Sequence, residues 1–378
     1  MAQYRFGVDI GGTFTDAVLI NLDTGEYRTS KVQTTPKDLS EGFLRAVERI
    51  VSQAAVNPPE VAQIVHATTI ATNAIIENKV AKGAFITTRG FRDILEIQRQ
   101  IRPSLYDLFF DKPVPLIPRY LCYEVTERVT AEGDVLSPLN EDEVRQVVQQ
   151  IKKEGAETIA VCFLHSYINP DHEKRTGEII RAEFPEAYLT LSSEINPEFR
   201  EYFRASTTVI NAVLMPSVTR YLSKLQAEIA SRGFKAGLYV MQSSGGLMTG
   251  KVAREKPATM VESGPAAGVI AAAALGTRLG YDNVISFDMG GTTAKAGLVE
   301  NGRPKLAMNY EVGSAAISPH AHGSKGSGYP LQTPVIDLVE IGAGGGSIAW
   351  IDTGGALRVG PHSAGADPGP ACHMTGGT

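Results

Sequence analysis

Cysteine is scarce in this sequence, which contains only Cys122, Cys162 and Cys372. An odd and widely spaced set offers no disulfide framework, and no Cys-x-x-Cys pair is present to bind zinc or exchange disulfides. Cys162 lies in the apolar run of residues 159–164, where we expect a buried strand thiol. Cysteine usage of this kind is typical of the reducing cytosol, so the sequence predicts a cytoplasmic protein.

Long apolar runs and an excess of positive charge are also missing. The longest apolar stretch, at residues 269–275, is too short and too rich in alanine to span a bilayer. No signal peptide is predicted, because the first residues already have the pattern of a strand. The formal net charge is −5, so there is no electrostatic reason to expect nucleic acid or an anionic membrane as a partner.

The histidines give little support to a metal site. His320 and His322 form a His-x-His pair, but no nearby cysteine or carboxylate completes a set of zinc ligands. We therefore expect this Gly/Ser-rich segment to be a solvated loop, or alternatively a loop that contacts substrate or a partner.

The most informative feature that the sequence does contain is a repeated Asp-x-Gly-Gly-Thr motif, at residues 9–13 and again at 288–292. Each copy follows an apolar strand pattern and leads through a second strand and a Gly-containing turn into a third strand. A unit repeated at this distance predicts two similar half-folds that face each other. Since strands alternate with helices along the chain, the predicted fold class is α/β with mixed sheets.

This repeated motif has the composition of a phosphate site. Paired glycines let a backbone approach an anion closely, and their amide groups form a nest that binds phosphate. Threonine hydroxyls add donors, and an aspartate at a strand end offers a carboxylate to Mg²⁺ or to water. A tight hairpin without a ligand is the structural alternative. Two copies in matching context favour phosphate binding and predict that Asp9 and Asp288 approach one another across a cleft.

The two half-folds are predicted to comprise residues 1–200 and 201–378, by pattern alone, because no clear linker marks their boundary. The second half contains an Ala/Gly-rich helix at residues 265–279, the second motif and a Gly-rich segment at residues 342–346. The sequence stops without a final strand or helix, which we interpret as a truncated end. The second half is therefore expected to expose apolar surface, and the chain to be weak or inactive alone.

The order of phosphate hairpin, second phosphate hairpin and Gly-rich segment resembles the superfamily of actin, hexokinase and the DnaK-type chaperones. The resemblance implies duplicated ribonuclease-H-like halves of the actin-like ATPase type, with a nucleotide cleft between them. It also implies ATP and Mg²⁺ as cofactors. Within the Gly-rich segment, it implies that the adenosine is held by Gly344, Gly345 and Gly346.

Longer and more specific motifs of this sequence are similar to those of the A subunit of the hydantoinase/oxoprolinase family. The resemblance implies an ATP-dependent hydrolase subunit that opens a cyclic amide, such as hydantoin, 5-oxoproline or another lactam, with a B-type subunit in a hetero-oligomer. One alternative is a ketone carboxylase subunit of the acetone or acetophenone type, and another is a catalytically idle nucleotide-binding module. The matching segments run from end to end of the chain and are residues 7–16, 66–74, 263–268, 287–293, 341–349 and 365–371.

The resemblance and the phosphate chemistry together suggest a role for each candidate residue. Asp9 and Asp288 are predicted to be catalytic and to bind Mg²⁺. His66 is predicted to contact the transferred phosphoryl group or the substrate, with an ordinary cap and turn as the alternative. Asp16 remains open between a third carboxylate and a polar strand residue, and Glu262 between a helix cap and a nucleotide contact. The predicted phosphate ligands are Gly11, Gly12, Thr13, Thr15, Gly290, Gly291, Thr292 and Thr293.

Overall fold

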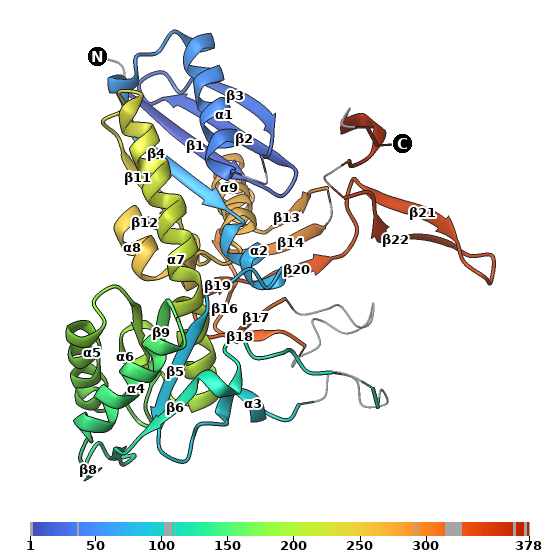
Figure 1. The fold of residues 1–378 in the computed structure, drawn as a ribbon. Helices are drawn as coiled ribbons and strands as arrows, with labels where there is room; N and C mark the ends of the chain where they lie inside the picture. The colour runs from blue at the N-terminus through green and yellow to red at the C-terminus, as the bar shows by residue number, and fades with distance from the viewer. Residues whose placement is uncertain are drawn as a thin grey trace.

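The computed structural model describes residues 3–35, 38–101, 108–109, 111–291, 293–313, 327–365, 368–373 and 376–377. Figure 1 shows an upper and a lower lobe joined by one long helix, α7 (Glu201–Ser231), with a further group of strands beside the upper lobe. Helices pack on parallel and mixed sheets, which confirms the predicted α/β class. Within the described ranges, no helix combines the length and the apolar character needed to cross a membrane.

The upper lobe is built on a six-stranded sheet. Its elements are β1 (Tyr4–Ile10), β2 (Phe14–Asn21), β3 (Tyr27–Gln33), α1 (Leu39–Ala54), β4 (Val61–Thr68), α2 (Ile70–Ile76), β11 (Gly237–Met241), β12 (Leu247–Thr249) and α8 (Gly250–Glu255). The strand order is β12-β11-β4-β1-β2-β3, in which β1 to β3 form an antiparallel meander and β4 runs parallel to β1. Helix α1 covers one face, because Phe43, Val47 and Ile50 recur at helical spacing and bury a single stripe against the strands.

The lower lobe contains a four-stranded parallel sheet in the order β10-β9-β5-β6. Its elements are β5 (Gly83–Thr88), α3 (Ile94–Ile97), β6 (Cys122–Val125), β7 (Arg128–Val129), β8 (Val135–Ser137), α4 (Glu141–Lys153), β9 (Thr158–Cys162), α5 (Asp171–Glu183), β10 (Tyr188–Leu191) and α6 (Ser192–Ile195). Helices α4 and α5 cover one face and α7 covers the other, so every residue of β5 and β9 is buried.

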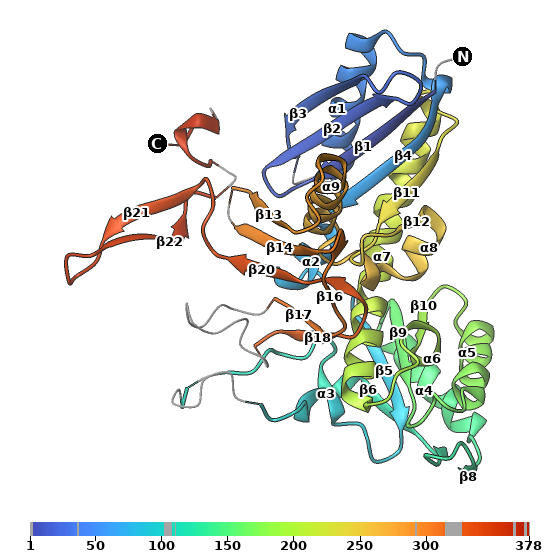
Figure 2. The same ribbon diagram turned by 180° about the vertical axis from the view of Figure 1, so that it is seen from behind.

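The strands beside the upper lobe form the second sheet and several two-stranded pairs. In the second sheet, β14 lies between β13 on one side and β15 and β20 on the other. Helix α9 (Ser263–Leu279) packs on one face of this sheet and also reaches the first sheet (Figure 2). The strands are β13 (Val284–Met289), β14 (Ala294–Glu300), β15 (Arg303–Pro304), β16 (Leu306–Ala307), β17 (Tyr310–Val312), β18 (Tyr329–Leu331), β19 (Val335–Ile336), β20 (Leu338–Ile341), β21 (Ser347–Ile351) and β22 (Leu357–Ser363). Short 3-10 helices are η1 (Pro58–Glu60), η2 (Arg119–Leu121), η3 (Pro257–Met260) and η4 (Ala371–His373).

The division into residues 1–200 and 201–378 stays a prediction. It falls at the start of α7, and the first sheet takes strands from both sides of it, since β11 pairs with β4. The parallel sheet of the lower lobe is thus inserted in the chain between β4 and β11. The expected apolar surface of the second half is confirmed, because Ile285 and Phe287 on β13 are 71% and 61% exposed.

The junction of the lower lobe with α7 depends on one buried guanidinium. Arg204 is 0% exposed, and it donates hydrogen bonds to the carbonyl oxygens of Phe163 and Glu198 and to the hydroxyl of Ser192. The same hydroxyl donates to the carboxylate of Glu173 on α5. Arg204 therefore ties the loop after β9 to three helices.

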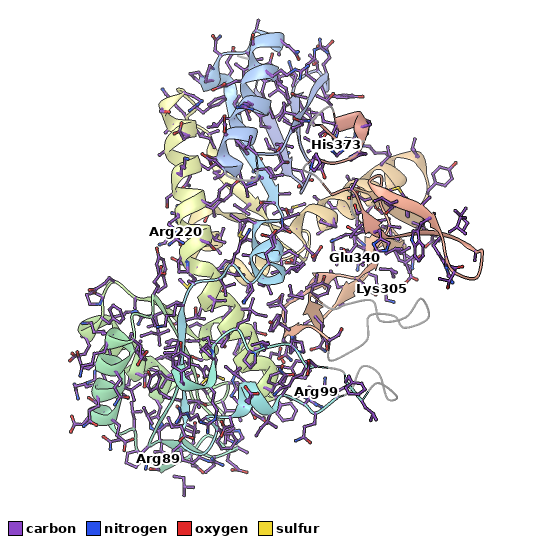
Figure 3. All side chains as sticks on the ribbon, turned by 45° about the vertical axis from the view of Figure 1, so that its right-hand side comes forward. Arg89, Arg99, Arg220, Lys305, Glu340 and His373 are labelled. Carbon is purple, nitrogen blue, oxygen red and sulfur yellow. The ribbon has the colours of Figure 1, made fainter. Side chains whose placement is uncertain are left out.

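Replacing this residue should destabilise the fold. Arg204→Met leaves buried acceptors without a donor, so we expect the free energy of unfolding to fall by about 3 kcal/mol. The matched control is Arg220→Met on the same helix, where the side chain is 67% exposed and projects outward (Figure 3). The control should change stability by at most about 1 kcal/mol. Thermal unfolding checks both variants, and equal Tm values would contradict the structural role given to Arg204.

Candidate phosphate site between two hairpins

The two Asp-x-Gly-Gly-Thr motifs form hairpins with the same geometry. In each, the amide of the first glycine donates to a carbonyl three residues later: Gly11 to Phe14 at 3.0 Å, and Gly290 to Thr293 at 2.9 Å. The aspartate lies on the strand before the turn in both hairpins. The repeat seen in the sequence is therefore a repeat of backbone structure.

The two hairpins meet at their tips. A Cβ built on Gly291 would lie 2.7 Å from the hydroxyl oxygen of Thr13, so the second turn touches the first. The charge of Asp288 is also close enough to contribute to the raised pKa of Asp9. The predicted approach of Asp9 and Asp288 is confirmed by this proximity.

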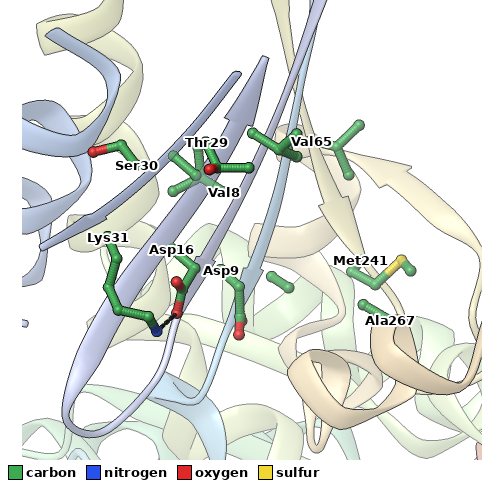
Figure 4. Close-up of a pocket in the computed structure, with 13 residues that line it drawn as sticks. Val8, Asp9, Asp16, Thr29, Ser30, Lys31, Val65, Met241 and Ala267 are labelled. Carbon is green, nitrogen blue, oxygen red and sulfur yellow. Dashed lines mark hydrogen bonds and ion pairs between the residues drawn. The ribbon is translucent and has the colours of Figure 1, made fainter. Parts of the chain in front are cut away.

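Asp9 is the most perturbed carboxyl of the site. Burial, followed by the charges of Asp16 and Asp288, raises the pKa of Asp9 to about 6, while Lys31 opposes the shift. One carboxylate oxygen, Oδ1, is buried and has no hydrogen-bond partner among the described residues. Figure 4 shows Asp9 and Asp16 projecting from neighbouring strands, with Lys31 paired to Asp16 at 2.7 Å. A buried oxygen without a donor, close to two other carboxylates, is a place that a cation would stabilise.

The start of α9 lies directly against Asp9. A Cβ built on Gly264 would come 3.0 Å from Asp9 Oδ1, so this position has little room for a side chain. The hydroxyl of Ser263 donates to the carbonyl of Thr68 at 3.1 Å and fixes the helix start to the end of β4. The positive end of the α9 dipole therefore faces the carboxylate and favours negative charge there.

A lysine at the second hairpin makes charged contacts that the sequence analysis did not predict. Lys295 pairs across the strands with Asp288, in the register position that Asp16 has opposite Asp9. Its ammonium forms an ion pair with the carboxylate of Glu262 and lies 3.7 Å from Glu340. A signal was present in the sequence, because Lys295 lies three residues after the second motif, at the position that Asp16 has after the first.

Glu262 joins the two halves rather than capping α9. Its side chain makes no capping hydrogen bond, which removes the cap alternative. Instead, its carboxylate holds Lys295 on β14, and its amide donates to the hydroxyl of Thr72 on α2 at 3.1 Å. The residue is 4% exposed and has a φ of 62°, a left-handed conformation that is uncommon outside glycine. Contacts on both sides hold it in that conformation.

His66 lies in the core instead of at the hairpins, so the predicted contact with substrate or phosphoryl group is not supported. Its ring is fully buried on the α1 side of the sheet, opposite Asp9, and packs on Phe43. Nδ1 donates to the carbonyl of Val8 at 3.1 Å, and Nε2 accepts from the hydroxyl of Tyr221 at 2.7 Å. Burial lowers the pKa of His66 to about 4, which keeps the ring neutral. His66 is a positioning residue that ties β1, β4 and α7 together.

The remaining predicted ligands divide into those at the turns and those that support them. Gly12 is exposed, and a Cβ built there meets nothing within 4 Å. Thr15 is fully buried and its hydroxyl lies 3.2 Å from that of Thr34, so it faces away from the turn's open side. Thr292, His320 and His322 lie outside the described residues.

The Gly-rich segment supports the second hairpin. The amides of Gly345 and Gly346 donate to the carbonyl oxygens of Gly290 and Gly291 at 2.9 and 2.7 Å. A Cβ built on Gly344 would lie 2.7 Å from the Gly290 carbonyl oxygen, so only glycine permits this approach. The structure brings these glycines to the phosphate hairpin, and their contact with adenosine stays a prediction.

The chain touches the first hairpin again near its end. Phe14 packs edge-on against the His373 ring with the centroids 5.4 Å apart. The side-chain amide of Gln33 donates to the His373 carbonyl at 2.9 Å. Figure 3 shows His373 beside the upper lobe. His373 therefore lies against the first hairpin.

A cavity of about 540 Å³ opens beside Asp9 on the face of the first sheet that α1 leaves uncovered (Figure 4). Its walls are mainly apolar and include Val18, Val65, Met241 and Ala267. Its charged end is formed by Asp9, Asp16 and Lys31. Apolar walls with a few convergent polar groups are typical of small-molecule sites.

Known proteins share both the sequence and the fold of this chain. A family model described as the hydantoinase/oxoprolinase N-terminal region matches residues 5–184, and one described as hydantoinase/oxoprolinase matches residues 204–378. An uncharacterised protein of Methanocaldococcus jannaschii is 50% identical over 99% of this chain and 54% of its own length. Caprolactamase subunit alpha of Pseudomonas jessenii is 34% identical over 99% of this chain and 53% of its own length. The chain thus spans about half the length of these curated relatives.

Solved structures also match the fold. The crystal structure of ATP-dependent caprolactamase from Pseudomonas jessenii has a TM-score of 0.85 and 33% identity, over 99% of this chain and 53% of that one. The nucleotide-free structure of acetone carboxylase, from a study of ATP-dependent acetone carboxylation, has a TM-score of 0.81 and 27% identity, over 100% of this chain and 53% of that one.

The raised pKa of Asp9 predicts that the stability of the fold depends on pH. Its pKa is raised from 3.8 to about 6 in the folded protein, so folding is favoured by the protonated form and loses about 3 kcal/mol as the pH rises through this interval. In metal-free buffer, Asp9→Asn should therefore raise Tm at pH 7, with little gain at pH 4. The control is the exposed Asp23→Asn, which should change Tm at neither pH. A lower Tm for Asp9→Asn at pH 7 would contradict the claim that the buried carboxylate of Asp9 destabilises the metal-free protein.

Proposed function

This chain belongs to the hydantoinase/oxoprolinase family, and from that premise we propose that it is the nucleotide-binding part of an ATP-dependent enzyme. Two of its relatives, a caprolactamase and an acetone carboxylase, are described as ATP-dependent or as acting in ATP-dependent chemistry. The proposed reaction transfers the γ-phosphoryl group of ATP to an oxygen of a carbonyl compound. Phosphorylation turns that oxygen into a leaving group and makes an unreactive carbonyl carbon open to attack.

The observation that carries this proposal is a buried oxygen of Asp9 where two glycine hairpins meet, which has no hydrogen-bond partner in the part of the chain that the structure describes. A carboxylate in this position is unfavourable until a cation neutralises it. Mg²⁺ bound to ATP would supply the cation, and the open space at Gly12 gives the phosphates access to the turn. Two hairpins that close on one nucleotide suit duplicated ribonuclease-H-like halves of the actin-like ATPase type, which we propose as the finer fold description.

In the proposed site, Asp9 and Asp288 would hold the Mg²⁺ that accompanies ATP. The described residues hold no group of three His, Cys, Asp or Glu side chains close enough to bind a metal unaided, and Mg²⁺ commonly takes one or two carboxylates plus phosphates. The cation would neutralise phosphate charge and align the group for transfer. The amides of the two turns and the hydroxyls of Thr13 and Thr293 donate to the phosphates, a role that we also propose for Thr292.

Lys295 gives the second hairpin a cation on the same face as Asp288. We propose that its ammonium lies beside the terminal phosphate and is held there by Glu262. The ammonium lies between the carboxylates of Glu262 and Glu340, so its position depends on these two partners. His66 acts indirectly, because it fixes the strand that carries Asp9.

A cyclic amide is the substrate class that we propose. The caprolactamase, whose name identifies a lactam-opening enzyme, has the higher identity and TM-score of the two solved relatives. The apolar walls of the cavity beside Asp9 suit the methylene groups of a lactam. Ketone carboxylation is the second candidate, supported by the acetone carboxylase structure, which matches 100% of this chain and 53% of its own. Because the caprolactamase relative is a subunit alpha, we also propose a B-type partner subunit.

A substrate screen tests this function. The chain is combined with a B-type subunit, and ADP release is followed with Mg²⁺-ATP and, in turn, hydantoin, 5-oxoproline, caprolactam, and acetone with bicarbonate. ADP release that depends on a lactam supports the amide hydrolase, and release that depends on ketone and bicarbonate supports the carboxylase. Nucleotide binding without turnover would identify an idle module. Absence of nucleotide binding would overturn the proposal as a whole.

Gly12 separates a phosphate site from an ordinary turn. In Gly12→Ala, the added methyl enters open space in the protein, so Tm should not change. The methyl would occupy the place of a phosphate oxygen, and the affinity for Mg²⁺-ATP should fall at least about 10-fold by calorimetry, equivalent to about 1.4 kcal/mol. Gly268→Ala on α9 is the control, since a Cβ there also meets nothing within 4 Å and no phosphate is expected nearby. Equal nucleotide affinity in both variants would refute the proposal that a phosphate of ATP lies at Gly12.

A further inference from the structure

The β17–β18 pair lies between the two lobes, where β17 contacts α2 and β18 contacts α7 (Figure 1 and Figure 2). It is a short antiparallel ladder in which Tyr310 pairs with Leu331 and Val312 pairs with Tyr329. Val312 and Leu331 are fully buried in the apolar core of the upper lobe. Because two strands of this length are barely stable by themselves, the groups that contact them determine where they lie.

The lower end of the pair is bonded to the first two turns of α7. The hydroxyl of Ser206 is buried and donates to the carbonyl of Pro330 at 2.7 Å. The amide of Gln332 donates to the hydroxyl of Thr207 at 2.9 Å, and its side-chain oxygen accepts from Asn196 at 3.0 Å. Asn196 directly follows α6 of the lower lobe. A shift of the lower lobe against the upper one therefore moves β18.

The upper end of the pair reaches the ion pair of the second hairpin. Burial raises the pKa of the Tyr310 phenol, and the charges of Glu262 and Glu340 and a hydrogen bond with Glu262 add to the shift. The ammonium of Lys295 lies between the same two carboxylates. Tyr310 and Lys295 therefore share Glu262 as a partner. Since Glu262 is buried, water does not readily replace a partner that it loses.

Helix α2 holds the same two elements by separate contacts. The hydroxyl of Thr72 accepts from the amide of Glu262 at 3.1 Å. A Cβ built on Gly313, the residue after β17, would lie 3.7 Å from Cγ1 of Ile76 at the end of the helix. Glu262 and β17 are thus packed on one helix, which fixes the distance over which the Tyr310 phenol reaches the carboxylate.

We propose that the β17–β18 pair lets the lower lobe set the position of the Lys295 ammonium, with Tyr310 as the positioning residue at its upper end. The proposal rests on the proposed function, in which this ammonium lies beside the terminal phosphate of ATP. Movement of α7 shifts β18 and its partner β17, and Tyr310 then shifts Glu262. Nucleotide affinity thus depends on the lower lobe, and by reciprocity nucleotide binding changes the first turns of α7.

Two variants test the pair by removing one bond at each end. Tyr310→Phe removes the phenol hydroxyl and keeps the ring, and Ser206→Ala removes the donor to the Pro330 carbonyl. Each should weaken binding of Mg²⁺-ATP to the 378-residue chain about 5-fold by calorimetry, the lower end of common coupling between sites. The double variant should bind no more weakly than either single variant, because both bonds act through one connection.

Matched controls remove a hydroxyl elsewhere. Tyr239→Phe changes a partly buried tyrosine on β11, in a different sheet. Ser217→Ala changes a serine of α7 whose hydroxyl donates to the Leu214 carbonyl of the same helix at 3.0 Å. Both controls should bind Mg²⁺-ATP with the affinity of the unaltered chain.

Hydrogen exchange supplies a measurement that a purely structural role of Tyr310 would leave unchanged. Addition of Mg²⁺-ATP should slow exchange at residues 204–208 about 5-fold in the unaltered chain, because binding at the hairpins restrains the connected pair. In Tyr310→Phe, saturated with the same nucleotide, exchange at these residues should not respond. Tm values of both proteins establish that the variant remains folded.

The outcomes separate this proposal from the proposed function. Nucleotide binding that neither variant weakens, losses that add in the double variant, or exchange at residues 204–208 that ignores nucleotide in the unaltered chain would each overturn the role of the β17–β18 pair and leave the ATP site in place. No binding of Mg²⁺-ATP to the unaltered chain would overturn both.

Discussion

The negative charge of Asp9, held out of water where the two hairpins meet, is the constraint on which the site depends. Its carboxylate faces two others, at Asp16 and Asp288, and one oxygen has no hydrogen-bond donor in the described protein. Gly264 at the start of α9 lies against that oxygen and leaves little room for a side chain. A site that is unfavourable when it contains only protein binds a cation more tightly, because the cation relieves repulsion that is already present.

The two hairpins share a backbone but differ in charge. In the first, Asp9 faces Asp16 across the strands, so the pair is wholly acidic. In the second, Asp288 faces Lys295, whose ammonium is held by Glu262. Glu262 directly precedes α9, the helix whose first turn lies against Asp9, and its amide also donates to Thr72 on α2. Movement of the second hairpin is therefore coupled to α9. The first hairpin is therefore acidic and attracts a cation, whereas the second hairpin carries the positive charge of Lys295.

Local sequence was a reliable guide to backbone and a weaker guide to side-chain direction. The repeated motif and the α/β class were both predicted from pattern, because turns need glycine and strands need alternating apolar residues. His66 shows where this reasoning stops. It belongs to the same segment as Ala67, which lines the cavity, but neighbouring residues of a strand point to opposite faces, and its ring enters the core beside Phe43.

The sequence by itself determined the two hairpins, their glycines and the aspartates beside them, since these depend on local backbone geometry. Only the tertiary structure decided which groups converge. It placed Gly264 against Asp9, set Lys295 on Glu262 and brought Gly345 to Gly290, contacts between residues far apart in the chain. It also decided that Phe6 is buried and Ile285 exposed, although their strands have the same pattern. Burial depends on what packs over a strand, and that is a property of the folded assembly rather than of any local segment.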